Sequence, residues 1–378
     1  MNYSLEKTKK KRVLVAMSGG VDSSVAAALL CEQGYDVIGV TMQVWDYSSN
    51  QCATDEGNGT CCSSLDVDDA RAVADKLQIP FYVINCEEKF KVAVIDQFVA
   101  SYLKGETPIP CVNCNTFLKF DYLIQKMKEL DCDYLATGHY AHIEKTEDRS
   151  LIVSSQDSWK DQTYFLFTLN REIINKLLFP LGTWQKSDVR IYAEKKGLAV
   201  ARKKDSTGIC FIGKSGYAGF IESQVDKDKL KPGLIKLFPT GETIGEHTGV
   251  HNFTIGQRRG LGIAVGRPVY TIRIDMETST VWMGDEEHLY SDSAVISDIN
   301  WMLPLEDGRL HAELSDGLID VKIRFAHKAT PARLVKKSDE RYELHFIEKQ
   351  RAVTVGQAAV FYKNKKLLGG GWITQAKV

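Results

Sequence analysis

Residues 12–24 read Arg-Val-Leu-Val-Ala-Met-Ser-Gly-Gly-Val-Asp-Ser-Ser, and this stretch decides the fold of the first half of the chain. The apolar run from Arg12 to Met17 is typical of a buried strand, and residues 23–33 have the period of a helix that ends at Gly34. Two glycines between them let the backbone approach an anion, and the amides that begin a helix favour phosphate. The stretch therefore predicts a strand, a phosphate-binding loop and a helix.

The loop is not a Walker loop, because GxxxxGK[ST] has a lysine after its second glycine, whereas Val21 and Asp22 follow here. The alternative is a plain glycine turn in which Asp22 or Ser23 caps the helix. We favour ligand binding, because the loop follows the first strand of a series of βα units, and ligands bind at the carboxyl edge of such sheets.

Strand and helix patterns alternate from Arg12 to about Cys210, which indicates βα units around a parallel sheet. Beyond Gly216, Val, Ile and Thr alternate with polar residues, and glycine recurs, which is typical of β structure. The further strands expected are 35–45, 81–85 and 134–137, and the further helices are 66–77 and 87–103. We therefore expect an α/β domain with a parallel sheet over residues 1–216, followed by two small mainly-β domains over 217–295 and 296–378.

Length and composition agree with this organisation. The chain has 378 residues, 44% of them hydrophobic and 26% charged, which excludes a disordered or collagen-like protein. Apolar stretches such as Val25 to Leu30 are far shorter than the roughly 20 residues of a membrane span, and residues 1–12 lack the apolar run of a signal peptide. We expect no membrane segment and a cytoplasmic location. The formal net charge of −1 neither requires nor excludes a nucleic-acid partner.

Ser18-Gly-Gly-Val-Asp-Ser23 resembles the pyrophosphate loop of the ATP pyrophosphatases, the PP-loop superfamily with an adenine nucleotide alpha hydrolase-like fold. These enzymes cleave ATP between its α and β phosphates and transfer AMP to an oxygen. Five further motifs follow in order: Gly138-His-Tyr140, Lys160-Asp-Gln162, Asp205-Ser-Thr-Gly-Ile-Cys-Phe-Ile-Gly213, Gly256-Gln-Arg-Arg-Gly-Leu-Gly262 and Gly369-Gly-Gly371. Together they resemble the tRNA 2-thiouridylase family over nearly the whole chain.

The resemblance implies that AMP is attached to O2 of the wobble uridine of a tRNA, and that sulfur from a cysteine persulfide then replaces this oxygen. ATP is required because the O2 carbonyl is a poor leaving group, and Mg²⁺ offsets the phosphate charge. The implied ATP-binding residues are Ala16, Met17, Ser18, Gly19, Gly20, Val21, Asp22, Ser23, Met42 and Gly138.

Cys111-Val-Asn-Cys114 is compatible with half a zinc site, a redox pair or a nucleophile beside a second thiol. A second Cys-x-x-Cys is absent, which weakens the zinc hypothesis. By resemblance, Cys114 is the nucleophile, Cys210 carries the persulfide, and Ile109, Pro110 and Cys111 surround the target base.

The chain departs from the better-known family pattern at Cys111, where an aspartate usually stands three residues before the nucleophile. A carboxylate role near the target base is therefore in doubt. Cys111, Cys114 and Cys210 could instead hold a four-iron, four-sulfur cluster with one open iron. We prefer a cluster-free persulfide relay, because three thiols do not by themselves establish a cluster.

The six other cysteines carry less information. Cys31, Cys86 and Cys132 lie in apolar patterns and are expected to be small buried residues. A metal site at Cys52, Cys61 and Cys62 would lack a fourth ligand at a usual spacing.

The resemblance also implies tRNA contacts at His139, Lys160, Asp161, Gln162, Arg324, Phe325 and Gln357. Three of these have structural alternatives: His139 and Phe325 could be core residues, and Asp161 could cap a helix. Basic residues gather between Val321 and Lys337 and again at residues 202–204, which agrees with an RNA-binding cleft although such clusters are often only solvated. The target uridine would be extruded to reach its pocket.

Two rival functions remain open at this point. Another ATP pyrophosphatase, such as an amide- or argininosuccinate-forming synthetase, would use the same loop but would not need Cys114 and Cys210. A non-catalytic RNA-binding redox or iron-sulfur sensor would not need the intact loop. The sulfur donor of a thiouridylase would be a protein such as a cysteine desulfurase or a sulfur carrier, which the sequence does not identify.

Overall fold

The computed structural model describes residues 10–45, 64–146, 149–206, 208–304, 308, 310, 314–338 and 341–377 of the chain. These form two compact units. Unit 1 comprises residues 1–91, 114–163 and 172–210, and unit 2 comprises residues 92–113, 164–171 and 211–378. Two segments of the amino-terminal half, 92–113 and 164–171, thus pack with the carboxyl-terminal half.

Unit 1 is built on a five-stranded sheet in which every neighbouring pair is parallel. The strand order is β3 (Phe81–Asn85), β2 (Asp36–Gln43), β1 (Arg12–Ala16), β4 (Tyr134–Thr137) and β7 (Leu177–Leu178). The chain proceeds from β1 to β2 and β3 on one side and places β4 on the other, so the strand order reverses between β1 and β4. Ligands of open α/β sheets bind beside such a reversal. The predicted parallel sheet is confirmed.

The inner strands β1, β2 and β4 of this sheet are buried, whereas β3 at its edge exposes Tyr82 and Val83. Val13, Leu14 and Val15 of β1 have no exposed surface, as expected for a strand buried on both faces. The helices α1 (Val21–Glu32) and α7 (Lys186–Lys195) contact each other, and α2 (Ser64–Leu77) contacts α1 and β2. The predicted elements at 12–17, 23–33, 66–77, 81–85 and 134–137 are confirmed within a few residues at each end.

Two longer helical stretches contain π-helical turns. The first, predicted over residues 87–103, consists of α3 (Glu87–Phe90), η1 (Lys91–Ile95) and α4 (Asp96–Leu103). Its apolar residues Phe90, Val94, Ile95 and Phe98 are buried. The second consists of α5 (Pro110–Asn113), η2 (Cys114–Tyr122) and α6 (Leu123–Glu129). Unit 1 also has a hairpin of β5 (Ala141–Lys145) and β6 (Ser150–Ser154).

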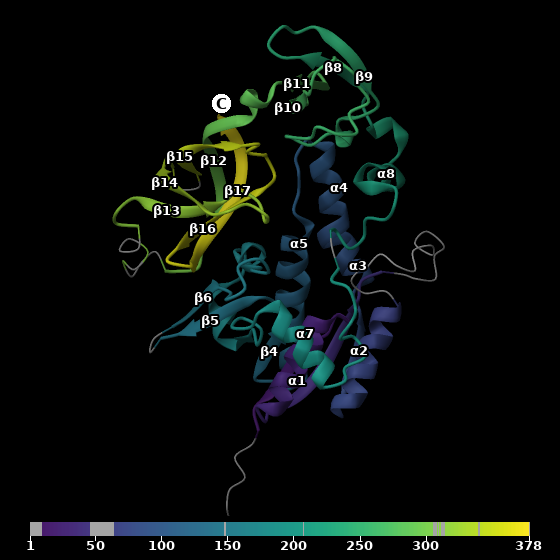
Figure 1. Cartoon of the computed structure of the whole chain (residues 1–378), viewed down its shortest axis with the longest axis vertical. Helices are drawn as coiled ribbons and strands as arrows, with labels where there is room; N and C mark the ends of the chain where they lie inside the picture. Colours follow the sequence, from purple (N-terminus) through teal and green to yellow (C-terminus); the bar gives the residue numbers. More distant parts are fainter. Residues whose placement is uncertain are drawn as a thin grey trace, which may run out of the picture. The chain divides into compact units, whose positions relative to one another are not determined.

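The carboxyl-terminal half is mainly β, as predicted. A four-stranded sheet follows the order β10 (Tyr270–Asp275), β11 (Thr280–Gly284), β8 (Gly233–Leu237) and β9 (Thr243–His247), and α8 (Gly216–Gln224) precedes it (Figure 1). Its core contains Ile235, Phe253, Val281 and Met283.

The last part of unit 2 is an antiparallel barrel, coloured light green to yellow in Figure 1. Its strand order is β12 (Tyr290–Trp301), β15 (Arg341–Arg351), β14 (Thr330–Lys336), β13 (Leu318–Lys322), β16 (Ala358–Lys363) and β17 (Lys366–Lys377), and pairing of β12 with β17 closes it. A Cβ at Gly369 would lie 2.3 Å from the Asn300 carbonyl oxygen, and one at Gly371 would lie 2.6 Å from that of Ser297. The glycine triplet of β17 is therefore needed for close strand approach.

Candidate active site

The loop from Met17 to Gly20 joins β1 to α1 at the strand-order reversal. Gly19 has a φ of +69°, and a Cβ there would lie 2.1 Å from the carbonyl oxygen of Asp66, so only glycine fits. Ser18 is exposed, and its backbone amide donates to Ser23 Oγ at 3.1 Å. The loop thus places exposed main chain at the start of α1, and the start of a helix is where anions bind.

The neighbouring strands complete a platform around this loop. The Met17 amide donates to the Val40 carbonyl at 2.8 Å, and Thr41 Oγ1 donates to the Met17 carbonyl at 2.6 Å. A Cβ at Gly138, just beyond β4, would lie 2.6 Å from the Ser23 amide nitrogen. The structure therefore brings together the carboxyl ends of β1, β2 and β4, where the predicted nucleotide residues Ala16 to Ser23, Met42 and Gly138 lie.

Asp22 binds Tyr140, which belongs to the Gly138-His-Tyr140 motif, and Lys186, which the sequence did not indicate. Its carboxylate accepts hydrogen bonds from the Tyr140 hydroxyl at 2.9 Å and from Lys186 Nζ at 2.7 and 2.8 Å. Burial raises the pKa of Tyr140, and the nearby Asp22 charge adds to this effect. Tyr140 therefore stays a neutral donor, and Lys186 brings a cation to the first turn of α1.

Asp205 links this cation to two more. Its carboxylate pairs with Lys186 Nζ at 2.8 Å, Lys160 Nζ at 2.7 Å and Arg190 Nη2 at 2.5 Å. Partial burial opposes ionisation of Asp205, but the hydrogen bonds from Lys160 and Lys186 outweigh it and hold its pKa at about 2. Asp205 is thus ionised at neutral pH and fixes three cations, of which Lys186 also pairs with Asp22 of the loop region.

Lys203 contacts the glycine loop, although the sequence placed it in a basic cluster that agreed with an RNA-binding cleft. Its Nζ donates to the Gly19 carbonyl at 3.0 Å and pairs with Asp66 and Asp69 at 2.5 Å each. Arg202, by contrast, is 91% exposed at its side chain. Within the basic run 202–204, Lys203 therefore stabilises the glycine loop, whereas Arg202 lies at the surface.

His139 lies at the carboxyl end of β4 with only 7% of its surface exposed. Its Nδ1 is 2.7 Å from Thr137 Oγ1, and its ring packs against Phe120 and Phe179. Burial lowers the pKa of His139 well below its usual value, so the imidazole is neutral. His139 has the packing of a core residue, and a tRNA contact there stays a prediction.

The Lys160-Asp161-Gln162 motif is tied into unit 1. Asp161 is buried, and its carboxylate accepts from the Ser155 amide at 2.7 Å and from Thr163 Oγ1 at 2.5 Å. Gln162 Oε1 accepts from the Tyr140 amide at 2.9 Å. Asp161 and Gln162 thus fix the backbone around Lys160, whose side chain is 41% exposed.

Cys111 and Cys114 lie in the first turns of the helical stretch that Pro110 begins, a position that proline favours. Both are half-buried. The thiol of Cys86, directly after β3, has its pKa raised to about 11 by burial, with a smaller contribution from Cys114. Cys114 therefore lies near the carboxyl edge of the sheet, where the glycine loop also lies.

Cys210 is half-buried and not in a disulfide. It follows Asp205 by five residues, so it lies within roughly 18 Å of that carboxylate's Cα in any conformation. Because Asp205 pairs with Lys186 and Lys186 with Asp22, the cysteine segment is tethered to the loop region.

The other cysteines divide as follows. Cys86 and Cys132 are buried as predicted, whereas the prediction for Cys31 is wrong, since Cys31 is half-buried at the margin of the core. Cys52, Cys61 and Cys62 lie outside the described residues. Among the described residues, no group of three or more His, Cys, Asp and Glu side chains is placed to hold a metal ion.

The predicted barrel residues have defined partners within unit 2. Gln357 Nε2 donates to the Thr107 carbonyl at 2.8 Å, and the Thr107 amide donates to the Val355 carbonyl at 2.9 Å. The barrel thereby holds the segment that leads to Ile109, Pro110 and Cys111. Arg324 donates to the Arg351 carbonyl at 2.8 Å.

Phe325 is 40% exposed, with its ring centroid 4.5 Å from that of Phe165. It is therefore not an ordinary core residue of the barrel.

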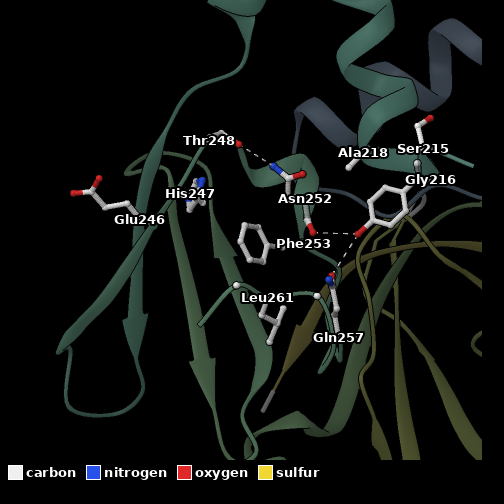
Figure 2. A pocket seen from close by; sticks show the side chains of 13 residues that line it. Ser215, Gly216, Ala218, Glu246, His247, Thr248, Asn252, Phe253, Gln257 and Leu261 are labelled. Atoms are coloured by element: carbon white, nitrogen blue, oxygen red, sulfur yellow. Dashed lines mark hydrogen bonds between the residues drawn. The ribbon is translucent and has the colours of Figure 1, made fainter. Parts of the chain in front are cut away.

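A cavity of about 460 Å³ lies beside the four-stranded sheet of unit 2. The Gly256–Gly262 motif contributes Gln257, Gly260, Leu261 and Gly262 to its lining, and Figure 2 shows Asn252, Phe253 and Gln257 around it. The Tyr217 hydroxyl is 3.2 Å from the Asn252 carbonyl and 3.4 Å from Gln257 Oε1. Gln257 Nε2 also donates to the Arg259 carbonyl at 3.1 Å, so the motif's glutamine holds the loop that carries the two arginines.

Within the part of the chain that the structure describes, no helix has the length and apolar character to cross a membrane.

Comparison with known families and proteins gives matches along the whole chain. The model of the tRNA methyl transferase HUP domain matches residues 11–214, that of the tRNA methyl transferase PRC-barrel domain matches 219–285, and that of the aminomethyltransferase β-barrel domain matches 291–373. The tRNA-specific 2-thiouridylase MnmA of Geotalea uraniireducens is 45% identical over 373 residues, which are 98% of this chain and 97% of that protein. The enzyme of the same name from Clostridium beijerinckii is 44% identical over 364 residues, 96% of this chain and 99% of its own. Because the identity is high and extends over nearly the full length, this chain belongs to the tRNA-specific 2-thiouridylase family.

Proposed function

We propose that this chain is an ATP-dependent tRNA 2-thiouridylase of the cytoplasm. The observation that carries the proposal is the glycine loop at the strand-order reversal, with Gly19 and Gly138 both packed too closely for a side chain, in a chain that belongs to this family. ATP would bind to residues 16–23 with Met42 and Gly138 at the adenosine, and Mg²⁺ would accompany its phosphates. We assign ATP binding and thiolation to residues 1–216, a central domain to 217–295 and the tRNA-contacting barrel to 296–378.

The charges around the loop suit adenylylation. Attack of the uridine O2 on the α phosphate expels pyrophosphate and concentrates negative charge beside α1. Lys186 and Lys203 are already held there by Asp22, Asp205 and the Gly19 carbonyl. Preorganised cations cost no rearrangement during the reaction. Lys186 and Lys203 are therefore the residues to which we assign phosphate stabilisation, besides the loop itself.

Sulfur transfer is assigned to Cys114 and Cys210. The Cys114 thiolate attacks the inner sulfur of a Cys210 persulfide, which forms a Cys114–Cys210 disulfide and releases hydrosulfide. Hydrosulfide then attacks C2 of the activated uridine, and AMP leaves with the former O2. A two-electron thiol reductant reopens the disulfide, and a sulfur donor protein, such as a cysteine desulfurase or sulfur carrier, renews the persulfide.

The target base is assigned to a pocket at Ile109, Pro110 and Cys111. The remaining RNA contacts are assigned to the set named from the sequence: His139, Lys160, Asp161, Gln162, Arg324, Phe325 and Gln357. Most of these side chains also have partners within their own unit, so their variants are to be tested for folding as well as for RNA binding.

The test is mass spectrometry of tRNA nucleosides after incubation with ATP and a sulfur source. We expect 2-thiouridine with the wild-type chain and none with Cys114→Ala or Cys210→Ala, while both variants still bind tRNA. Cys31→Ser, a thiol in the same unit but outside the site, is the matched control and should remain active. Normal thiolation by Cys114→Ala would disprove the assignment.

The alternative uses a four-iron, four-sulfur cluster on Cys111, Cys114 and Cys210, which would supply an open iron for sulfur. Cys111, which replaces the family's usual carboxylate, is the observation that favours it. Anaerobic purification decides between the two: a brown protein with iron and sulfide that loses both in Cys111→Ser would support the cluster. A colourless wild-type protein with full activity would support the relay.

A further inference from the structure

Trp159 is exposed to an unusual degree. It lies in unit 1 after β6, and 93% of its surface is accessible, whereas Leu65 and Ile191, the next most exposed large apolar residues among those that the structure describes, reach 63%. Tryptophan has the largest apolar surface of any side chain, and a bare indole forgoes the stabilisation that burial would give. Its position therefore requires a reason other than folding of the unit.

The backbone beneath this indole is held rigidly by a buried carboxylate. Asp157 is 7% exposed, and its Oδ1 accepts from the Trp159 amide at 3.1 Å and from the Lys160 amide at 3.2 Å. Its Oδ2 accepts from the Lys186 amide at 2.9 Å. The turn is thus fixed to the start of α7, so a partner that binds the ring would have to order only its side-chain torsions and not the backbone.

The turn is also connected to the glycine loop through ion pairs. Lys160, the next residue, pairs with Asp205 at 2.7 Å, Asp205 pairs with Lys186 at 2.8 Å, and Lys186 pairs with Asp22 at 2.7 Å. A ligand stacked on Trp159 would therefore lie beside a lysine and within one ordered network of the nucleotide site. An aromatic face next to a cation is the pattern with which proteins bind unpaired nucleotides.

We propose that Trp159 is a stacking platform for an unpaired nucleobase of the RNA substrate, outside the target-base pocket. This rests on the proposed function and adds to it a second base-binding position. Stacking tolerates any base, because every base has a π face. Trp159 thus supplies affinity and orientation while the pocket selects the uridine.

The experiment measures binding of a fluorescently labelled tRNA to the full chain by anisotropy. Trp159→Ala should weaken the affinity about tenfold or more, whereas Trp159→Phe, which keeps an aromatic face, should stay within about threefold of the wild type. The dependence of affinity on salt should keep its slope in Trp159→Ala, because stacking releases no counterions. Lys160→Ala, in contrast, should reduce the slope.

Trp184→Phe is the matched control, since Trp184 packs against the core of the same unit with its ring 5.6 Å from that of Tyr192. It should leave tRNA affinity unchanged. Wild-type affinity in Trp159→Ala would overturn the platform and leave the proposed function intact, whereas failure of the wild-type chain to bind tRNA would overturn both. Normal tRNA binding with loss of sulfur uptake from a donor protein would assign Trp159 to a protein interface instead.

Discussion

The sheet edge of unit 1 and the barrel of unit 2 each contain a carboxylate clamped by lysines, but only one of them leads to a site. Asp205 is paired with Lys160 and Lys186, and Lys186 continues to Asp22 beside the glycine loop. Glu343 of β15 is paired with Lys337 and Lys377. Hydrogen bonds from these lysines lower the pKa of Glu343 to about 2, the same value as for Asp205. A depressed carboxyl pKa therefore does not by itself mark function, and the connection to the loop does.

The largest effect is expected from a substitution that disturbs the carboxyl edge of the sheet in unit 1. Gly138→Ala would place a Cβ 2.6 Å from the Ser23 amide nitrogen and 2.8 Å from the Asp22 carbonyl carbon, so the start of α1 must shift. A displacement of this kind costs about 100-fold in rate. We expect tRNA-dependent release of pyrophosphate from ATP to fall by that factor. Gly213→Ala, which has no atom within 4 Å of its added Cβ, is the control, and equal activities would contradict the packing argument.

Removal of one cation from the network should have the next largest effect. Lys186→Met keeps the length of the side chain but leaves Asp22 and Asp205 without their shared partner, and we expect about a 10- to 100-fold loss of AMP formation. Lys196→Met, which removes a surface pair with Glu32 and a cation–π contact with the Tyr192 ring, should retain wild-type turnover. If both variants were equally active, the network would be structural.

A smaller effect is expected where the barrel holds the cysteine segment. Gln357→Ala removes the hydrogen bond to the Thr107 carbonyl, which costs about 1 kcal/mol of unfolding free energy. Thiolation should fall several-fold because the segment before Cys111 is less well positioned, while ATP binding should be unchanged. Chemical denaturation and single-turnover thiolation measure the two effects. Gln375→Ala, at an exposed position of β17, should change neither.

The smallest effect concerns pH. Because the pKa of Asp205 falls from its ordinary value of 3.8 to about 2 on folding, its contribution to the free energy of unfolding is complete above about pH 4 and is lost as the pH falls towards 2. Its partial exposure reduces this contribution to about 1 kcal/mol. Asp205→Asn should lower the free energy of unfolding at pH 7 and weaken its dependence on pH between about 4 and 2. Glu343→Gln should also weaken this pH dependence, because the pKa of Glu343 is lowered on folding as well. Only Asp205→Asn should reduce ATP turnover.

Much of the fold follows from local patterns. Continuous apolar runs predicted β1, β3 and β4 within one residue. β1 and β4 are buried, as strands of a parallel sheet usually are, whereas β3 is the edge strand and exposes Tyr82 and Val83. The loop at Ser18–Ser23 was recognisable because its conformation requires glycine: Gly19 has a φ of +69° and no room for a side chain. Lys186 gave no such signal, since a lysine at the start of a helix looks like any solvated cation.

The sequence by itself determined the chemistry available: an anion loop between a strand and a helix, a Cys-x-x-Cys pair and a distant third thiol. Only the tertiary structure decided which charged side chains lie at the loop, namely Lys186 and Lys203. Lys186 lies 164 residues from Asp22, and Lys203 lies 184 residues from Gly19. Local propensity and periodicity report on neighbours a few residues apart, whereas ion pairs and hydrogen bonds at such separations arise from packing of α7 and the following segment against the sheet. The same physical reason separates Lys203 from its exposed neighbour Arg202, although the two are adjacent in the chain.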